Sequence, residues 1–250
     1  MEGIGRFYRV GGAMARSAGV FVFVGVLVFW LGVAAAFAQE PPRPTIVVFG
    51  DSQAQGLAGG LSRVLLDDPR FRVLNRTHPG AALVHGESEW LAPVQRFVGR
   101  EKADIAVVMF GANDRLDFRD ESGAYVRFRS EPWRAAYAAR IGKIFAALGG
   151  AGLKVIWCGN PIARSPTYSA DMGYINTIYE EETRRFGGQF VSLWSAVADG
   201  GGNYAAYGKD RDGVTQRMRA DDGIHFTSAG YELIAEKILV MLTTSAANLR

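Results

Sequence analysis

Five short runs of apolar and β-branched residues, separated by segments with helical spacing, constrain the fold of this chain more than any other feature. Most of the runs are apolar nearly throughout, which is expected of strands that are covered on both faces. Strands that alternate with helices predict a parallel sheet with helices on both of its faces. The runs lie at residues 45–49, 71–74, 104–110, 154–158 and 189–193.

Two of the intervening segments carry an apolar stripe at helical spacing. The first begins near Pro132 and stops at Gly149-Gly150, which fits the positions that these residue types take in helices. The second follows two N-cap candidates, Thr227 and Ser228. The predicted stripes are Trp133, Tyr137, Ile141, Ile144, Phe145 and Leu148, and then Tyr231, Ile234, Ala235, Ile238, Met241 and Leu242.

Two polar excursions interrupt this alternation, at residues 115–130 and 199–223. Within the second, the segments 203–207 and 214–219 predict a β-hairpin with a glycine-containing turn. Long excursions in a compact α/β domain are usually functional or disordered. Both follow predicted strands, where such folds place their ligand crevice.

The first 38 residues differ in character from the rest of the chain. Three arginines precede an apolar run at residues 19–38, which ends in Ala-Phe-Ala. This pattern predicts a secretory signal peptide over residues 1–38. The alternative is an uncleaved membrane anchor at residues 20–37, because the run reaches the ~18 residues at which spanning becomes possible. Either interpretation predicts export to the periplasm or cell envelope, and membrane contact is predicted only through this segment if it is not cleaved.

The remainder is predicted to be a linker at residues 39–44 and a single domain at 45–250. Beyond residue 38 the chain has 25 basic and 24 acidic residues, so the computed pI of 9.1 does not predict a nucleic-acid partner. The single cysteine, Cys158, allows no intramolecular disulfide and is predicted to be buried and inert. With three histidines and one cysteine, no metal or cofactor is predicted.

Ser52 stands where the first strand turns into the first helix. At that corner its hydroxyl would lie near free backbone N–H groups and the positive helix end, which suits an oxyanion. A plain N-cap serine is the alternative. The sequence Gly-Asp-Ser-Gln-Ala-Gln-Gly lacks the glycine spacing and the lysine of a phosphate loop. It is also not a G-x-S-x-G nucleophile elbow, because Ala54 fills the last position.

His225 is the candidate base, because Asp222 precedes it by three residues immediately before the last helix. A carboxylate at that spacing can accept the imidazole N–H, fix the tautomer and stabilise the imidazolium. Asp221 competes for this role, although its spacing is less favourable. The alternative is an ordinary Asp-Gly surface turn.

Two further turns offer hydrogen-bond donors for an oxyanion. Gly111, Asn113 and Asp114 follow the third strand, and the Asn113 amide could stabilise a developing negative charge. Gly80, after the second strand, could bring a backbone N–H to the same point. Each turn taken alone is unremarkable. Together with Ser52 and the His–Asp pair, they form a complete set of groups for acyl transfer at one edge of the sheet.

These turns resemble the four sequence blocks for which the SGNH (GDSL-type) hydrolases are named. Residues 50–52 are similar to the nucleophile block, and Gly80 to the glycine of the second block. Residues 111–114 match the pattern G-x-N-D, and residues 222–225 match D-x-x-H. The blocks occur in the expected order, and the resemblance spans residues 45–242.

The resemblance implies a flavodoxin-like three-layer α/β/α sandwich. Its five-stranded parallel sheet would have the order 2-1-3-4-5, and it would hydrolyse esters or thioesters without a metal. Two features depart from the family pattern. Gln53 stands where the fuller motif has leucine, and the segment before Asp222 is extended, so no relative's substrate can be transferred directly.

The resemblance and the residue chemistry together assign a role to each residue. Ser52 would attack an acyl carbonyl, with His225 as general base and Asp222 as its orienting partner. The N–H groups of Ser52 and Gly80, with the Asn113 amide, would hold the oxyanion. The supporting residues would be Asp51, Gly111 and Asp114.

Export suggests an O-acetyl ester on a cell-envelope glycan as the substrate. The alternatives within the same chemistry are a lipase, a lysophospholipase or a thioesterase, and a non-catalytic protein that binds an envelope glycan or partner is the alternative of another class. Aromatic side chains could provide stacking faces for a glycan, although some of them would belong to the core. The candidates are Trp90, Trp133, Tyr168, Tyr204 and Tyr207.

Overall fold

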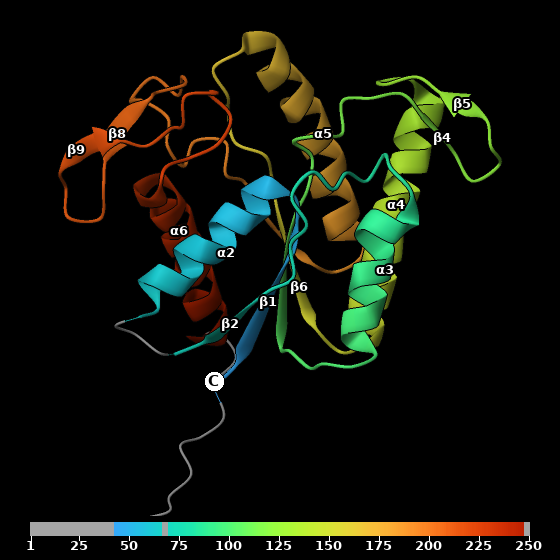
Figure 1. The fold of residues 1–250 in the computed structure, drawn as a ribbon, viewed down its shortest axis with the longest axis horizontal. Helices are drawn as coiled ribbons and strands as arrows, with labels where there is room; N and C mark the ends of the chain where they lie inside the picture. The colour runs from blue at the N-terminus through green and yellow to red at the C-terminus, as the bar shows by residue number, and fades with distance from the viewer. Residues whose placement is uncertain (1–42, 67–69, 248–250) are drawn as a thin grey trace, which may run out of the picture. The chain divides into compact units, whose positions relative to one another are not determined.

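The five apolar runs form one parallel sheet in the computed structural model, which describes residues 43–66 and 70–247 (Figure 1). The sheet order is β2-β1-β3-β6-β7, which is 2-1-3-4-5 when its strands are counted along the chain. The predicted fold class is therefore confirmed. The strands are β1 (Thr45–Gly50), β2 (Arg72–Asn75), β3 (Ile105–Met109), β6 (Lys154–Cys158) and β7 (Gln189–Val191).

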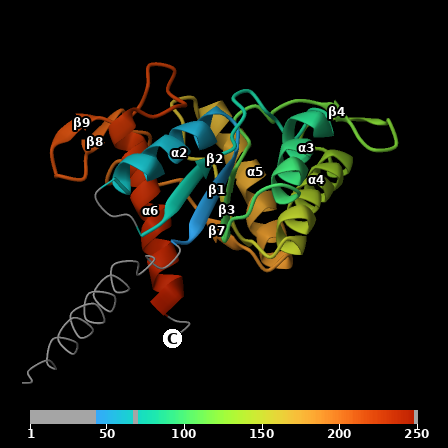
Figure 2. The same cartoon turned by 60° about the horizontal axis from the view of Figure 1, so that its bottom comes forward.

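The strands are apolar throughout because both faces of the sheet are covered. On β1, Ile46 and Val48 pack into one core while Val47 and Phe49 pack into the other. Side chains alternate between the two faces of a strand, so a strand inside three layers needs apolar residues at every position. Helices α2 (Ser52–Val64) and α6 (Ser228–Ala247) cover the first face, and α3 (Glu87–Val98), α4 (Glu131–Gly150) and α5 (Pro166–Arg185) cover the second (Figures 1 and 2).

Both predicted helical stripes form helices. α4 begins after Ser130, whose side chain accepts a hydrogen bond from the N–H of Trp133, and it ends at Gly150. α6 begins at Ser228, and its preceding residue Thr227 accepts a hydrogen bond from the N–H of Gly230. These caps satisfy donors that the first turn of a helix leaves free.

Both polar excursions contain short hairpins. The predicted hairpin in the second is confirmed, with β8 (Tyr207–Lys209) antiparallel to β9 (Thr215–Arg217). Its first strand starts only at the end of the predicted segment 203–207. The first excursion holds an unpredicted hairpin of β4 (Phe118–Arg119) and β5 (Tyr125–Val126). Both hairpins lie at the end of the molecule where β1 leads into α2, at the top of Figure 1.

The described residues, 43–66 and 70–247, include no helix that is long and apolar enough to cross a membrane. The signal peptide or anchor predicted within residues 1–38, and the linker up to residue 42, lie outside them. Cys158 is buried, as predicted, and burial raises the pKa of its thiol to about 12.

Gly50 makes the sharp corner between β1 and α2 possible. Its φ is +142°, and a Cβ placed there would lie 1.8 Å from the carbonyl oxygen of Met109. We expect Gly50→Ala to lower the free energy of unfolding by about 3 kcal/mol or more, because the collision is with backbone of the central strand β3. Denaturant titration monitored by circular dichroism measures this change.

Gly59→Ala on α2 is the matched control. Its Cβ would meet only the end of the flexible Arg63 side chain, at 3.3 Å. Alanine there is expected to raise stability by up to about 1 kcal/mol, since glycine is unfavourable inside a helix. Equal effects of the two substitutions would show that the corner places no special demand on Gly50.

Candidate active site

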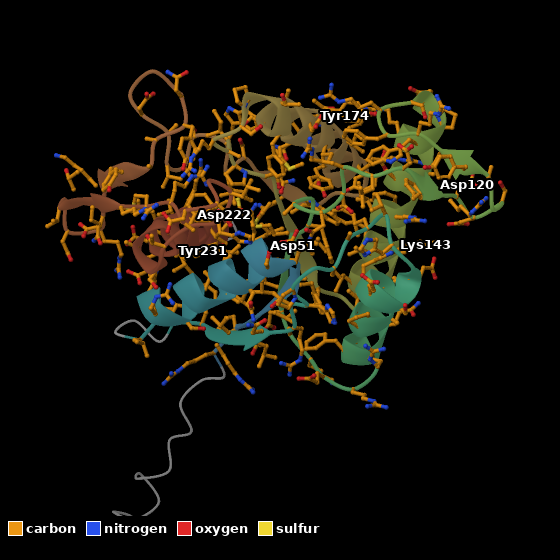
Figure 3. All side chains as sticks on the ribbon, turned by 45° about the horizontal axis from the view of Figure 1, so that its top comes forward. Asp51, Asp120, Lys143, Tyr174, Asp222 and Tyr231 are labelled. Carbon is orange, nitrogen blue, oxygen red and sulfur yellow. The ribbon has the colours of Figure 1, made fainter. Side chains whose placement is uncertain are left out.

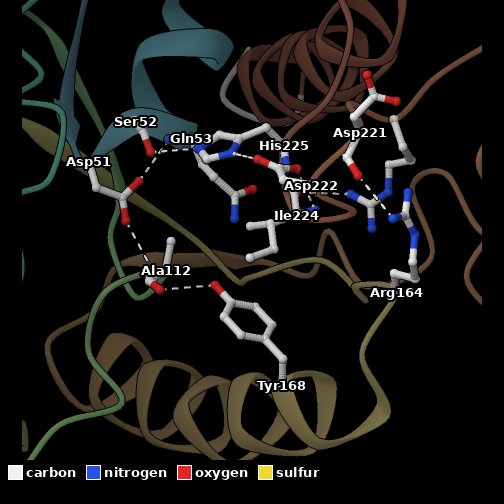
Figure 4. Close-up of polar contacts among 11 residues, drawn as sticks. Asp51, Ser52, Gln53, Ala112, Arg164, Tyr168, Asp221, Asp222, Ile224 and His225 are labelled. Carbon is white, nitrogen blue, oxygen red and sulfur yellow. Dashed lines mark hydrogen bonds and ion pairs between the residues drawn. The ribbon is translucent and has the colours of Figure 1, made fainter.

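The hydroxyl of Ser52 lies at the start of α2 and contacts the imidazole of His225. The distance from Ser52 Oγ to His225 Nε2 is 2.7 Å, across 173 residues of sequence (Figure 4). Ser52 is the first residue of the helix, and its neighbour Asp51 is the N-cap, accepting a hydrogen bond from the N–H of Gln53 at 2.9 Å. The N-cap position therefore belongs to Asp51, which leaves the Ser52 hydroxyl available for other contacts.

Asp222 holds the other side of the His225 ring. Its Oδ2 lies 2.6 Å from His225 Nδ1, and its Oδ1 accepts hydrogen bonds from the N–H groups of Ile224 and His225 at 2.8 and 2.9 Å. Because an ionised carboxylate can only accept, Nδ1 carries a hydrogen and Nε2 is free to accept the Ser52 proton. This arrangement gives His225 the tautomer of a general base.

The structure distinguishes Asp222 from its neighbour. The side chain of Asp221 is 91% exposed and pairs with Arg217. Burial opposes ionisation of Asp222, but hydrogen bonds from the His225 ring and from two backbone N–H groups outweigh it and lower its pKa to about 2. Asp222 is therefore ionised at any pH at which His225 can act as a base.

Two of the three predicted oxyanion donors, Gly80 and Asn113, lie on adjacent turns. Asn113 Nδ2 donates to the carbonyl oxygen of Ala81 at 3.2 Å, next to Gly80. Gly80 has a φ of +84° and open space where a side chain would be. One N–H of the Asn113 amide remains for another acceptor, because the amide nitrogen carries two hydrogens.

Asp51 links the Ser52 corner to the turn that carries Asn113. Its two carboxylate oxygens accept hydrogen bonds from the N–H groups of Gln53 and Ala112, at 2.9 and 3.1 Å. The residue is 1% exposed, and burial together with the nearby charge of Asp114 raises its pKa to about 7. Asp51 therefore braces the turn that carries Asn113 against the start of α2.

Gly111 and Asp114 fix the same turn to the core. A Cβ on Gly111 would lie 2.2 Å from Asn160 Nδ2, so only glycine fits there. Asp114 is fully buried and accepts hydrogen bonds from the N–H of Val84 at 3.0 Å and from the Tyr137 hydroxyl at 2.7 Å. These contacts agree with the supporting role that the sequence predicts for Gly111 and Asp114.

The raised pKa of Asp114 predicts a stability change with pH. Burial raises this pKa to about 6 from an ordinary value of 3.8. The folded state then holds the proton more tightly than the unfolded state, so the stabilisation is complete below pH 4 and is lost as pH rises through 6. Two pKa units correspond to roughly 3 kcal/mol.

In the parent protein, the free energy of unfolding should fall between pH 4 and pH 7 as Asp114 loses its proton. We expect this fall to be smaller by about 3 kcal/mol in Asp114→Asn, because asparagine cannot ionise. Asp212→Asn is the control, because Asp212 is exposed. Urea titrations at several pH values measure the effect. An unchanged decline in Asp114→Asn would show that Asp114 ionises normally in the folded protein.

Tyr168 also contacts the site, although the sequence predicted it only as a stacking face. So do Arg164 and Arg219, which the sequence did not single out; Figure 4 draws Tyr168 and Arg164. The Tyr168 hydroxyl donates to the carbonyl oxygen of Ala112 at 3.0 Å. Arg164 contacts the His–Asp turn twice, since its backbone N–H donates to Gly223 and its guanidinium donates to the carbonyl of Asp221, each at 2.9 Å. Arg219 is buried beside the same turn. No sequence spacing indicates these contacts, because they join separate elements.

The structure places most of the candidate stacking faces in the core, as expected for Trp133 from its predicted helical stripe. Trp90 and Trp133 are 1% and 0% exposed and belong to the core, because both rings lie on the inner faces of helices. Tyr168 is also buried, and its hydroxyl is used in the site. Tyr204 is half-buried, and Tyr207 on the β8–β9 hairpin is 63% exposed. Of the five aromatic residues, Tyr207 is thus the one that offers a free face.

Figure 3 turns the edge that carries these turns toward the viewer. Asp51 and Asp222 lie near the middle of this face, and Asp120 lies at its side on the β4–β5 hairpin. Within the described part of the chain, no group of three or more His, Cys, Asp and Glu side chains is placed to hold a metal ion.

The sequence matches a known family over residues 45–241, under the description "Protein of unknown function (DUF459)". No curated protein matches it. The solved structures of similar fold include a member of the lipolytic protein G-D-S-L family from Veillonella parvula. It is 16% identical, with a TM-score of 0.58 over 80% of this chain and 99% of that one.

Two further structures of similar fold come from proteins named for carbohydrate substrates. The periplasmic domain of a Salmonella ser. Paratyphi A lipopolysaccharide acetyltransferase is 15% identical, with a TM-score of 0.56 over 85% of this chain and 88% of that one. An acetylxylan esterase from Geobacillus stearothermophilus is 14% identical, with a TM-score of 0.52 over 80% and 95%. The predicted resemblance to GDSL-type hydrolases is thereby confirmed at the level of the fold.

Proposed function

This chain belongs to the DUF459 family, and we propose that it is an exported serine ester hydrolase that removes small acyl groups from a cell-envelope glycan. One observation carries the enzymatic part of this proposal. The contacts of 2.7 Å between Ser52 and His225 and 2.6 Å between His225 and Asp222 form a continuous chain of hydrogen bonds from the hydroxyl to the carboxylate. A hydroxyl, an imidazole and a carboxylate in this order can generate a serine nucleophile at neutral pH.

In the proposed reaction, His225 Nε2 takes the hydroxyl proton as Ser52 Oγ attacks the acyl carbonyl carbon. The resulting oxyanion accepts hydrogen bonds from the N–H groups of Ser52 and Gly80 and from the Asn113 amide. When the intermediate collapses, the bond to the alcohol oxygen breaks and His225 gives its proton to that oxygen. A water molecule then attacks the acyl-enzyme in the same way, which releases the acid and restores Ser52.

The two polar excursions favour a small acyl group over a long chain. Residues 115–130 and 199–223 follow strands at the edge of the sheet where Ser52 lies, and a lipase or lysophospholipase would need a continuous apolar groove there. A cavity of about 1090 Å³ lies at the starts of three strands instead, where Asp104, Lys154 and Gln189 line it. Ser52 follows the end of β1, at the opposite edge of the sheet, so this cavity cannot receive an acyl chain attached at Ser52.

Two observations support a glycan as the carrier of the acyl group. The exposed ring of Tyr207 lies on a hairpin at the same end of the molecule as Ser52, and exposed aromatic rings can stack on sugars. Two proteins of similar fold are named for acetyl groups on carbohydrate, a xylan and a lipopolysaccharide. The proposed export rests on the pattern of residues 1–38.

The test is a comparison of kcat/KM for 4-nitrophenyl acetate with that for the decanoate ester. We expect the acetate to be preferred at least about tenfold, because the extra methylene groups of the decanoate chain would not fit a site for a small acyl group. A preference for the decanoate ester would favour the lipase alternative. Labelling with a fluorophosphonate addresses the remaining rival, because a non-catalytic glycan-binding protein would not be modified at Ser52.

A further inference from the structure

Residues 164–171, the α5 start, contact both of the turns that carry the proposed catalytic groups. The Tyr168 hydroxyl donates to the carbonyl oxygen of Ala112 at 3.0 Å, in the turn of the oxyanion donor. The backbone N–H of Arg164 donates to the carbonyl oxygen of Gly223 at 2.9 Å, in the turn of the base. The side chains of the α5 start are therefore placed beside the reacting groups (Figure 4).

Arg164 places a guanidinium group against the turn of the base. The group donates to the carbonyl oxygen of Asp221 at 2.9 Å, as Figure 4 shows. A Cβ on Gly223 would lie 2.5 Å from the Cβ and 3.0 Å from the Nε of Arg164, so this side chain runs directly along the turn. Arg164 is exposed, and it forms no ion pair with any residue that the structure describes, since the Asp221 carboxylate pairs with Arg217 instead.

Two further guanidinium groups contact the α5 start and share one carboxylate. The guanidinium carbon of Arg115 lies 4.9 Å from the ring centre of Tyr168, and its Nε lies 2.7 Å from Asp171 Oδ2. Arg129 Nη2 lies 2.9 Å from Asp171 Oδ1 and donates to the carbonyl oxygen of Ala170 at 2.7 Å. Both arginines remain partly exposed, so one of their two positive charges has no counter-charge in this group.

The α5 start thus carries more positive than negative charge. Among the described residues, it and the side chains that contact it have three guanidinium groups and one carboxylate, an excess of two positive charges. Two other carboxylates of the site are engaged elsewhere, Asp222 by the His225 ring and Asp221 by Arg217. The first turn of α5 has no acidic side chain, although the positive end of a helix favours one. Like charges held this close repel one another, and a bound anion would relieve that repulsion.

We propose that the glycan proposed above as the substrate is acidic, and that Arg115 and Arg164 bind a carboxylate or phosphate group close to its acyl ester. A guanidinium group offers parallel N–H donors that match the oxygens of either anion. Arg115 follows the oxyanion donor Asn113 by two residues, and Arg164 packs against the turn of the base. An anion that they hold would therefore place the adjoining sugar beside Ser52. This inference rests on the proposed function, because it names the substrate class of the same site.

Three acetate esters that differ in one group test this inference. The first, para-acetoxybenzoate, carries a carboxylate, para-acetoxyphenyl phosphate carries a phosphate, and methyl para-acetoxybenzoate carries neither. In Arg164→Gln we expect the fall in kcat/KM for the anionic esters to exceed the fall for the neutral ester about fivefold, mainly through KM, as for one exposed charged contact. Differences in chemical reactivity cancel, because each ester is compared with itself in the parent. An effect confined to one anion would assign that group to the glycan.

Arg211→Gln is the matched control, because it removes the same charge from a residue that pairs with Glu236 at the surface. It should change kcat/KM for the three esters by the same factor, within about twofold. Arg164→Gln should fold, since Arg164 is exposed and glutamine keeps a donor for the Asp221 carbonyl. Adding Arg115→Gln should widen the difference between anionic and neutral esters to about twentyfold, by the same reasoning. If the double variant does not fold, Arg164→Gln alone decides.

A binding measurement does not depend on hydrolysis. Isothermal titration calorimetry with Ser52→Ala compares oligogalacturonate with its methyl ester, which has the same sugars without the negative charge. We expect the acidic oligosaccharide to bind at least about tenfold more tightly, and Arg164→Gln in the same background to remove most of the difference. Added salt should weaken the preference, because these charges are exposed.

The outcomes separate this inference from the proposed function. Equal falls for anionic and neutral esters in an active enzyme would overturn the acidic substrate and leave the ester hydrolase in place. A parent protein that hydrolyses no ester would overturn the proposed function, and the titration would then decide the inference alone. Equal binding of the two oligosaccharides, or binding of neither, would overturn it, whereas binding of the acidic one that depends on Arg164 would support recognition of an acidic glycan.

Discussion

Ser52→Ala is expected to lower kcat/KM for acetyl esters by about 10,000-fold or more. The Ser52 hydroxyl is 2.7 Å from His225 Nε2, and alanine leaves neither an oxygen to attack the carbonyl nor a proton for the histidine to take. The residual rate would come from the oxyanion donors and from binding alone. Steady-state hydrolysis of 4-nitrophenyl acetate measures the loss, and fluorophosphonate labelling should disappear with it.

Ser62→Ala provides the control for this variant. Ser62 lies on the same helix, is exposed, and donates its hydroxyl to the carbonyl oxygen of Ala58. Its substitution should leave kcat/KM within about twofold, since an isolated surface change has little effect. Full activity in Ser52→Ala would eliminate the serine mechanism, and a fold close to that of the parent by circular dichroism would show that the result is chemical.

Asp222→Asn should have the second largest effect, a fall in kcat of about 10,000-fold, as in comparable triads. The carboxylate accepts the Nδ1 hydrogen of His225 at 2.6 Å. An asparagine can turn its NH₂ group toward Nδ1 instead, and the ring then carries its hydrogen on Nε2, facing Ser52. In that tautomer the histidine cannot accept the serine proton.

Asp221→Asn is a closely matched control, because it changes the adjacent carboxylate in the same turn. Asp221 pairs with Arg217 at the surface, and its side chain is 91% exposed. We expect kcat to change by less than about threefold, as for other exposed ion pairs. A larger loss in Asp221→Asn than in Asp222→Asn would mean that the orienting carboxylate has been misassigned. Both are measured in the same ester assay over pH 5–9.

The described structure explains why some of these residues could be predicted. Apolar residues on successive positions of β1 indicate a strand covered on both faces, and the alternation with helices then restricts the topology. In a parallel sheet all strands end at one edge, so the residues after β1, β2 and β3 gather there. Ser52, Gly80 and Asn113 could therefore be predicted from the sequence to lie at this edge of the sheet.

Other features could not be predicted because their causes are not local. Trp90 is an aromatic residue that could stack on a sugar, yet it is buried between α3 and the sheet. Sequence spacing only favours Asp222 over Asp221 as the partner of His225. The hydrogen bonds of the turn identify Asp222, because Asp221 pairs with Arg217 instead. The sequence predicts an excursion at residues 115–130 but no hairpin, because β4 has only two residues. A distant residue stabilises this hairpin, since the Arg140 guanidinium donates to the carbonyl oxygen of Arg119.

The sequence alone predicts the layer architecture and the small set of polar residues at one edge of the sheet. Its resemblance to a known family predicts the strand order. The layers and the polar residues follow from periodicity and chain order, which act between neighbouring residues, whereas the strand order follows from the resemblance alone. Which groups touch depends on the tertiary structure, in which Ser52 reaches His225 across 173 residues and Arg219 lies fully buried opposite Phe226, next to the same turn. Such contacts depend on how separate elements pack together, and packing is a property of the whole fold that no local pattern encodes.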